Sequence, residues 1–221
     1  MSGLFEVADY IERALRAASS PTEIAIPAIR PRDNSLVHIS SANRCGRQIA
    51  YRLRFPLERS TTSLAADLGT VAHQFLQARV KRWFPDTLIE APVSWLPKYP
   101  VIGSADIVCD DGVIDIKTHA SYRTPKGDSA HVLQVVLYAL RLGKPKAMVL
   151  YVDRGTLTQS MTVVDVLGEA EDAYAELDRM KGIYDNLLDE MPKPTAMMEG
   201  SRECSYCYFR EVCLREKSLG R

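Results

Sequence analysis

Asp106, Asp115 and Lys117 have the side-chain types and the spacing of a hydrolytic metal site. Asp115 and Lys117 alternate with isoleucines, which is typical of a half-buried strand, and Asp106 lies on the preceding strand. With a turn at Asp111–Gly112, positions 106 and 117 pair across a hairpin, so all three side chains share one face of the sheet. Neighbouring carboxylates suit Mg²⁺ or Mn²⁺, and the ammonium group can hold a water for phosphodiester hydrolysis. A surface ion pair between Asp115 and Lys117, with Asp106 solvated, explains the same spacing.

Helical residues could complete this site. His73 lies beside the apolar stripe of its predicted helix, although a lone helical histidine is more often structural. Gln134 and Tyr138 are one turn apart on the next predicted helix, so they share one face. Their amide and phenol could contact phosphate or a catalytic group, or they could form an ordinary pair at the helix rim. Glu90 and His131 are further polar residues close to the predicted site, without an assigned role.

Four cysteines have the spacing of a metal-binding set. Cys204, Cys207 and Cys213 lie close together in a polar and aromatic segment, and Cys45 stands alone far upstream. Four thiolates suit tetrahedral zinc or an iron–sulfur cluster, and the sequence leaves both open. Cys109, at the end of a predicted strand, is expected to be an ordinary small buried residue.

Hydrophobic periodicity predicts a mixed fold in which helices flank a central sheet, of the α/β or α+β class. We divide the chain into an N-terminal helical region (1–62), a core (63–190) and a cysteine-rich tail (191–221). The expected helices are 4–18, 40 or 41 to 53, 63–83, 128 or 129 to 142 and 165–190. The expected strands are 37–39, 87–95, 99–109, 113–117, 146–153 and 156–164, with a connector over 21–35.

Composition limits the possible functions. The 221 residues contain 28 Lys and Arg and 28 Asp and Glu, so the formal net charge is 28 − 28 = 0. Any contact with nucleic acid must therefore use a local patch. The sequence has no secretory signal pattern at its start and no apolar run long enough to span a membrane, which predicts a cytoplasmic protein in a reducing compartment with no membrane partner.

Four short motifs, in order, resemble the RecB-type nucleases of the PD-(D/E)xK superfamily. They are Gly69-x3-His73, Gly103-Ser-Ala-Asp106, Asp115-Ile-Lys117 and Gln134-x3-Tyr138. The resemblance implies a restriction-endonuclease-like core and assigns roles by position. The implied metal ligands are His73, Asp106, Asp115 and the main-chain carbonyl of Ile116. Lys117 would orient the attacking water, and Gln134 and Tyr138 would position Lys117 and the DNA backbone.

The cysteines extend this resemblance. One upstream cysteine followed by the nuclease motifs and Cys-x2-Cys-x5-Cys resembles the iron–sulfur subset of the family, which includes the CRISPR-associated RecB-like exonucleases, their viral relatives and AddB-type nuclease domains. By that resemblance Cys45, Cys204, Cys207 and Cys213 would ligate a 4Fe-4S cluster that clasps the tail to the N-terminal helical region. Zinc is the alternative occupant.

The sequence therefore predicts an Mg²⁺- or Mn²⁺-dependent DNA exonuclease. The resemblance implies action on single-stranded DNA or duplex ends with 5′-to-3′ polarity, with endonuclease action also open. Arg47, near the predicted cluster, is a candidate contact for DNA. One alternative is a DNA-end-binding or processing subunit of a larger recombination, repair or CRISPR-adaptation complex, with little activity alone. Another is a zinc-stabilised structural module without catalysis.

Overall fold

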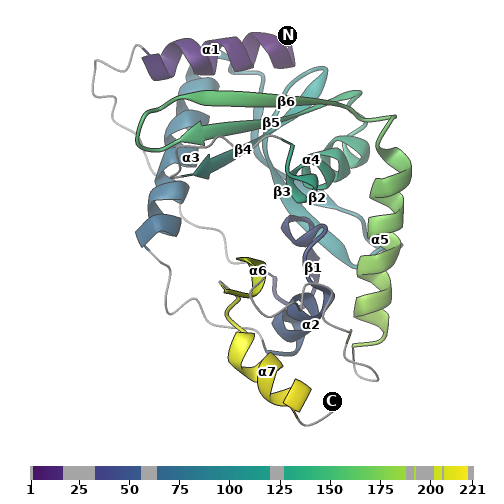
Figure 1. Cartoon of the computed structure of the whole chain (residues 1–221). Coiled ribbons are helices and arrows are strands. Elements are labelled where there is room, and N and C mark those ends of the chain that lie inside the picture. Colours follow the sequence, from purple (N-terminus) through teal and green to yellow (C-terminus); the bar gives the residue numbers. More distant parts are fainter. Residues whose placement is uncertain are drawn as a thin grey trace.

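The computed structural model describes residues 2–16, 33–55, 64–119, 127–187, 192, 202–205 and 207–218. Within these ranges the chain forms one mixed sheet with strand order β1-β3-β4-β5-β6, and β2 pairs with β3 (Figure 1). The strands are β1 (Val37–His38), β2 (Leu88–Ser94), β3 (Val101–Val108), β4 (Gly112–His119), β5 (Lys146–Asp153) and β6 (Gln159–Asp165). The pairs β1–β3 and β4–β5 are parallel and the others antiparallel, which confirms the predicted mixed fold.

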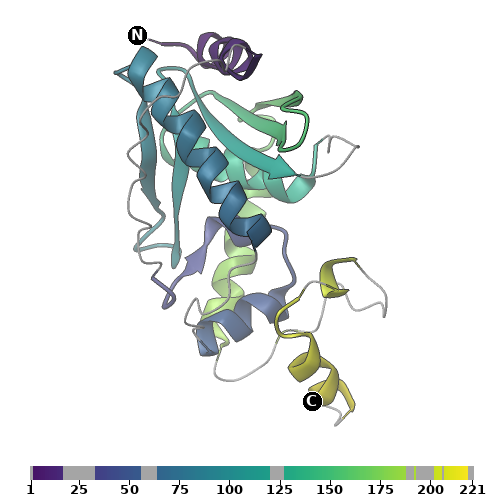
Figure 2. The ribbon, with the colours of Figure 1, turned by 90° about the vertical axis from the view of Figure 1, so that its left-hand side faces the viewer.

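Helices cover both faces of this sheet (Figure 2). α1 and α3 pack on one face, and α4 packs on the other with α2 and α5 around it. The short helices α6 and α7 lie beside α2 in both views (Figures 1 and 2). No helix in the described ranges is both long and apolar enough to cross a membrane. The helices are α1 (Leu4–Arg16), α2 (Gly46–Arg54), α3 (Leu64–Trp83), α4 (Ser129–Arg141), α5 (Ala170–Asp185), α6 (Arg202–Ser205) and α7 (Arg210–Ser218).

The turn between β3 and β4 corrects the predicted register. The N–H of Cys109 donates to the carbonyl of Gly112 at 2.8 Å, so Asp110–Asp111 form the turn, and position 108 pairs with 113 rather than 115. Gly112 serves packing instead, because a Cβ there would lie 2.4 Å from the Leu4 side chain of α1. Since side-chain direction repeats every two residues, this shift leaves the shared face of positions 115 and 117 unaltered.

Two helices begin later than predicted. Ile39–Ser41 form a 3₁₀ turn, and the left-handed backbone of Asn43 (φ 52°) prevents one continuous α-helix, so α2 begins at Gly46. Asp165 is the last residue of β6, so α5 begins only at Ala170. The predicted connector over 21–35 lies almost wholly outside the described residues. The last long helix is predicted to reach about 190, but α5 ends at Asp185 and a turn follows at 186–187.

One edge of β3 is partly unpaired, and this opens a gap in the sheet. On that edge, among the described strands, positions 101 and 102 pair with β1, and positions 107 and 108 pair with β4. β2 runs along the opposite edge of β3. The stretch 103–106 therefore has no strand neighbour on the β4 side, and side chains from the flanking helices can reach the gap.

The hairpin turn also holds α1 in place, which gives a test of the fold. Asp111 accepts the Leu4 N–H at the start of α1 (2.7 Å) and pairs with Lys146 (2.9 Å). We expect Asp111→Ala to lower the free energy of unfolding by about 1 kcal/mol, as loss of a helix cap does. The Lys146 hydrogen bond and then the Leu4 N–H lower the pKa of Asp111, so its stabilisation is present above the ordinary pKa and is lost as the pH falls through the lowered value.

Urea unfolding at neutral and acid pH measures this effect. The difference between wild type and Asp111→Ala should shrink in acid. Asp110→Ala is the matched control, because within the described part of the chain Asp110 forms hydrogen bonds through its backbone, to Ser2 and Lys144, and not through its side chain. An equal loss of stability in both variants would contradict the assignment.

Candidate active site

The carboxylate of Asp106 occupies the gap in the sheet. Its Oδ2 accepts a hydrogen bond from the backbone N–H of Ile116 on β4 at 2.7 Å. A side chain thus takes the place of a strand-to-strand backbone hydrogen bond, and β3 and β4 separate beyond the pair Ile107–Ile114. This arrangement brings a buried carboxylate directly beside the strand that carries the other predicted site residues.

Asp115 and Lys117 project from β4 into the same space. Lys117 Nζ lies 2.9 Å from Asp115 Oδ2, and the Asp115 side chain is only 2% exposed. Gln134 of α4 accepts from Lys117 Nζ (2.9 Å) and donates to Asp115 Oδ1 (3.1 Å) and to the Tyr138 hydroxyl (3.2 Å). Because an ammonium group only donates and a carboxylate only accepts, these partners fix the orientation of the Gln134 amide.

His73 reaches the site from α3, on the other face of the sheet. Its Nδ1 lies 3.4 Å from Asp106 Oδ2, so one carboxylate contacts both a helix and β4. The structure therefore brings together every predicted residue of the catalytic set from four different elements. They are His73, Asp106, Asp115, Lys117, Gln134 and Tyr138.

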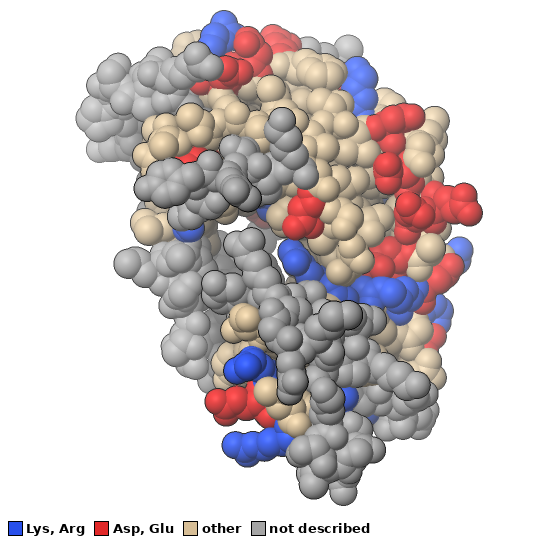
Figure 3. Space-filling view, in the orientation of Figure 1, with Lys and Arg blue, Asp and Glu red and all other residues tan. Residues whose placement is uncertain are grey.

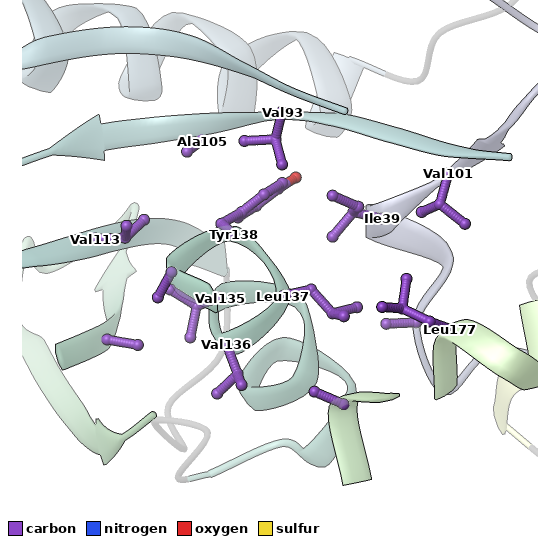
Figure 4. Close-up of a cluster of buried hydrophobic side chains, with 14 of the residues drawn as sticks. Ile39, Val93, Val101, Ala105, Val113, Val135, Val136, Leu137, Tyr138 and Leu177 are labelled. Carbon is purple, nitrogen blue, oxygen red and sulfur yellow. The ribbon is translucent and has the colours of Figure 1, made fainter. Parts of the chain in front are cut away.

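The glycines of the motifs permit close approach of these elements. A Cβ at Gly103 would lie 2.8 Å from the Tyr138 ring, so only glycine lets α4 press this ring against β3. Figure 4 shows the Tyr138 ring directed toward Ile39, Val93 and Ala105. A Cβ at Gly69 would lie 3.1 Å from Thr118 of β4, which brings α3 close to the site strand. These glycines set the distances between elements.

Burial and neighbouring charges shift the pKa values of Asp106 and Asp115 in opposite directions. Burial raises the pKa of Asp115 to about 6. The Lys117 charge opposes this rise, and the Asp106 charge adds to it. Burial alone would also raise the pKa of Asp106, but the hydrogen bond and charge of His73, with Lys117 and the Ile116 N–H, lower it overall. Burial alone would lower the pKa of the His73 imidazole, but the contact with Asp106 raises it overall. Cationic partners thus neutralise this carboxylate pair.

The donor set fits a divalent cation. Asp106, Asp115 and His73 offer carboxylate oxygens and an imidazole, which suit Mg²⁺ and Mn²⁺, with the imidazole favouring Mn²⁺. The buried Asp115 Oδ2 makes no hydrogen bond of suitable geometry, and the nearby Lys117 ammonium neutralises its charge. Among the described side chains, no three His, Cys, Asp or Glu residues form a ready-made cage. Binding would therefore move Lys117 away from Asp115 or His73 away from Asp106.

Three polar residues behind Asp106 were not assigned from the sequence. Glu90 of β2 accepts from Gln77 of α3 (2.7 Å) and from the Ser104 hydroxyl (2.8 Å), and Gln77 also donates to the Asp106 carbonyl (3.3 Å). Glu90 has a left-handed backbone (φ 50°), which costs about 1–2 kcal/mol in a residue with a Cβ. Gln77 could have been found as the residue one turn after His73, whereas a left-handed glutamate leaves no signal in the sequence.

Arg47 is placed differently from the prediction. It is 4% exposed, and its guanidinium pairs with Glu216 of α7 (2.5 Å) and donates to the Tyr51 hydroxyl (3.3 Å). Tyr51 also donates to Glu216, and its ring stacks on Phe209. Arg47 therefore joins α2 to the tail from a buried position and offers no surface cation to a DNA backbone. The sequence of α2 alone could not reveal this contact, because Glu216 lies far along the chain.

Cys45, Cys204, Cys207 and Cys213 act on one another electrostatically at the same junction, but among the described residues they form no ready-made metal-binding group. Burial raises the pKa of Cys213, and the neighbouring Cys45, Cys207 and Cys204 raise it further against the lowering effect of Arg47. Gln48 of α2 donates to Cys207 Sγ at 3.7 Å, which links the tail to the helix that follows Cys45. Cys109 is buried and isolated from this group, as expected, and burial raises the pKa of its thiol to about 12.

Comparison with known proteins agrees with this geometry. The profile of the PD-(D/E)XK nuclease superfamily matches residues 89–214, which is more than half of the chain. The chain belongs to this superfamily. The match includes Asp106, Asp115, Lys117 and the tail cysteines, whereas His73 precedes it. The sequence matches none of the curated proteins with which it was compared.

Solved structures share the PD-(D/E)XK fold of this chain. SSO0001 is similar with a TM-score of 0.59 and 19% identity, covering 96% of each chain. An alkaline exonuclease (LHK-Exo) from Laribacter hongkongensis has a TM-score of 0.50 and 14% identity, covering 70% of this chain and 92% of its own. A phage related exonuclease from Haemophilus somnus 129PT has a TM-score of 0.51 and 13% identity, covering 66% and 82%. At these identities the likeness shows the fold alone.

The Gln134 network gives a test of the PD-(D/E)XK site. Gln134→Leu keeps the volume but removes the bonds that hold Lys117 and Asp115, so we expect the nuclease rate to fall by about 10–100-fold. Tyr138→Phe removes only one bond of the same amide and should cost less. Initial rates of DNA cleavage, with folding checked by circular dichroism, measure both. Wild-type rates for folded Gln134→Leu would show that the network has no part in catalysis.

Proposed function

We propose that this protein is an Mg²⁺- or Mn²⁺-dependent DNA exonuclease of the RecB type. It would act on single-stranded DNA or duplex ends with 5′-to-3′ polarity, and endonuclease action is part of the same proposal. The observation that supports it is the convergence of Asp106, Asp115 and Lys117 at the gap between β3 and β4, with His73 beside them. Superfamily membership and two structural relatives named as exonucleases point the same way.

The residues divide the work of phosphodiester hydrolysis. His73, Asp106, Asp115 and the Ile116 carbonyl would hold the cation, which when bound supplies a positive charge opposite the phosphate. Released from Asp115, the Lys117 ammonium can donate to the attacking water and orient its oxygen toward phosphorus. Gln134 keeps Lys117 in place through its Oε1. The oxygen–phosphorus bond forms as the bond to the leaving oxygen breaks, while the attacking water gives up a proton to solvent and the leaving oxygen takes one up.

Surface charge limits where the substrate can lie. Figure 3 shows acidic side chains gathered over α5, and the exposed members there include Glu171, Asp172 and Asp178. Phosphates are repelled from this surface, so we place the DNA away from α5. Lys117 and His73, with side chains 23% and 25% exposed, are the groups of the site that solvent reaches most.

Cleavage of end-labelled single-stranded DNA tests the proposal. We expect the wild type to degrade it with Mn²⁺ or Mg²⁺ and not with EDTA, and Lys117→Ala to lose at least about 100-fold in rate because a charge-stabilising donor is removed. Comparing 5′ and 3′ labels gives the polarity. Lys146→Ala is the matched control, since Lys146 pairs with Asp111 at the hairpin turn and should leave the rate unchanged.

Two outcomes would overturn the nuclease proposal. Metal-independent cleavage would place the activity elsewhere. DNA binding without cleavage, across several metals and substrates, would favour the DNA-end-binding or processing subunit of a larger complex. Cleavage by Lys117→Ala at the wild-type rate would remove Lys117 from the mechanism.

For the tail, we infer that Cys45, Cys204, Cys207 and Cys213 hold a 4Fe-4S cluster, with zinc as the alternative. The electrostatic contacts among these thiols support the inference. Arg47 lies near Cys213 and Arg52 lies near Cys207, so two cations flank the group of thiols. The cluster would clasp α6 and α7 to α2, in parallel with the Arg47–Glu216 pair.

Cys207→Ala tests the ligand assignment. A bound cluster contributes to folding, so this variant should lose the brown colour and become less stable and less soluble. Visible absorbance, iron and zinc analysis and thermal unfolding measure the change. Cys109→Ala is the control and should keep its colour, because Cys109 is buried far from the tail in the α1–α3 core. A brown and fully stable Cys207→Ala variant would refute the assignment, and colourless wild type with stoichiometric zinc would select zinc.

A further inference from the structure

Glu90 marks a break in an otherwise regular pair of strands. β2 and β3 pair on both sides of it, with Ile89 opposite Ile107 and Ala91 opposite Ala105, yet Glu90 and Asp106 between them are unpaired. The backbone of Glu90 is left-handed at this point (φ 50°). Surrounding contacts must hold such a conformation, because a residue with a Cβ disfavours it.

Both strands change face at this break. In a regular strand, residues two apart face the same side. Ile89 packs against the α1–α3 core, whereas Ala91 belongs to the α4 core. Ile107 and Ala105 on β3 divide between the two cores in the same way. The backbone therefore rotates at positions 90 and 106 together, and this rotation directs the Asp106 carboxylate toward β4, where it meets the Ile116 N–H.

The side chain of Glu90 fixes the rotated segment from two directions. One oxygen accepts from Gln77 Nε2 of α3 (2.7 Å), and the same amide donates to the Asp106 carbonyl (3.3 Å). The other oxygen accepts from the hydroxyl of Ser104, two residues before Asp106 (2.8 Å). Each Glu90 oxygen thus has a donor of its own, so this carboxylate acts on Asp106 and not as a cation ligand.

We propose that Glu90 is a positioning residue of the metal site. Its left-handed backbone and its bridge to Gln77 and Ser104 hold Asp106 in the orientation that binds the cation. The proposal rests on the metal dependence proposed above. It assigns to Glu90 a geometric role in which its negative charge is dispensable.

Glu90→Gln and Glu90→Ala separate geometry from charge. A glutamine can accept from Gln77 through Oε1 and donate to the Ser104 hydroxyl through Nε2, so the bridge survives without the charge. Alanine keeps the same backbone requirement but removes the bridge. We expect Mn²⁺ binding to the protein alone, followed by the electron paramagnetic resonance of free Mn²⁺, to weaken about 10–100-fold in Glu90→Ala and less than about threefold in Glu90→Gln.

Two further variants complete the experiment. Ser104→Ala removes one bond of the bridge without touching β2, should weaken Mn²⁺ binding several-fold, and decides the question if Glu90→Ala does not fold. Leu157→Ala is the matched control, because Leu157 also has a left-handed backbone (φ 58°) but lies in the β5–β6 turn. Its Mn²⁺ affinity should equal that of the wild type, and DNA affinity in EDTA should be unchanged in all variants.

Three results would overturn the proposal. Equal weakening in Glu90→Gln and Glu90→Ala would show that the charge matters and that Glu90 is itself a ligand. Wild-type Mn²⁺ affinity in folded Glu90→Ala and Ser104→Ala would show that the bridge does nothing. A wild type that neither binds Mn²⁺ nor cleaves DNA would remove the proposed function first, and the role of Glu90 with it.

Discussion

The hydrogen bond from the Ile116 N–H to Asp106 Oδ2 is the contact on which the site depends. It ends the β3–β4 ladder after two pairs and keeps the strands apart without leaving a buried backbone donor unsatisfied. At the resulting gap, α3 contacts Asp106 through His73, and α4 contacts Asp115 through Gln134 from the opposite face of the sheet. A fully paired sheet would separate these helices by a layer of backbone, and His73 could not reach Asp106.

Charge balance follows from this geometry. Two carboxylates buried at one point would repel each other and lose hydration, so each needs a cationic partner. His73 serves Asp106 and Lys117 serves Asp115, and the amide of Gln134 connects the second pair to Tyr138. In the function that we propose, a divalent cation would take over the neutralisation of these carboxylates from their side-chain partners. The PD-(D/E)XK motif is thus a balanced set of charges as well as the ligand set that we propose.

The sequence predicted what depends on local periodicity. Alternation placed Asp115 and Lys117 on one face even with the wrong turn, and the spacing of Gln134 and Tyr138 placed them together on α4. Asp106 joins them through a rotation of β3 that alternation does not predict. Gly112 misled the register because its small size serves Leu4 and not the turn. Arg47 was misassigned because its partner Glu216 is distant in sequence. Residue types and their spacing can be read from the sequence, whereas close packing and pairing between distant residues appear only in three dimensions.

The Arg47–Glu216 pair also sets an order of events during folding. Its members are 169 positions apart, so α2 is synthesised long before the carboxylate that neutralises its buried cation. Until Glu216 and Phe209 arrive, Arg47 and Tyr51 stay exposed to water, and closing so long a loop carries an entropic cost. The α2 region therefore leaves the ribosome well before the segment that completes its burial.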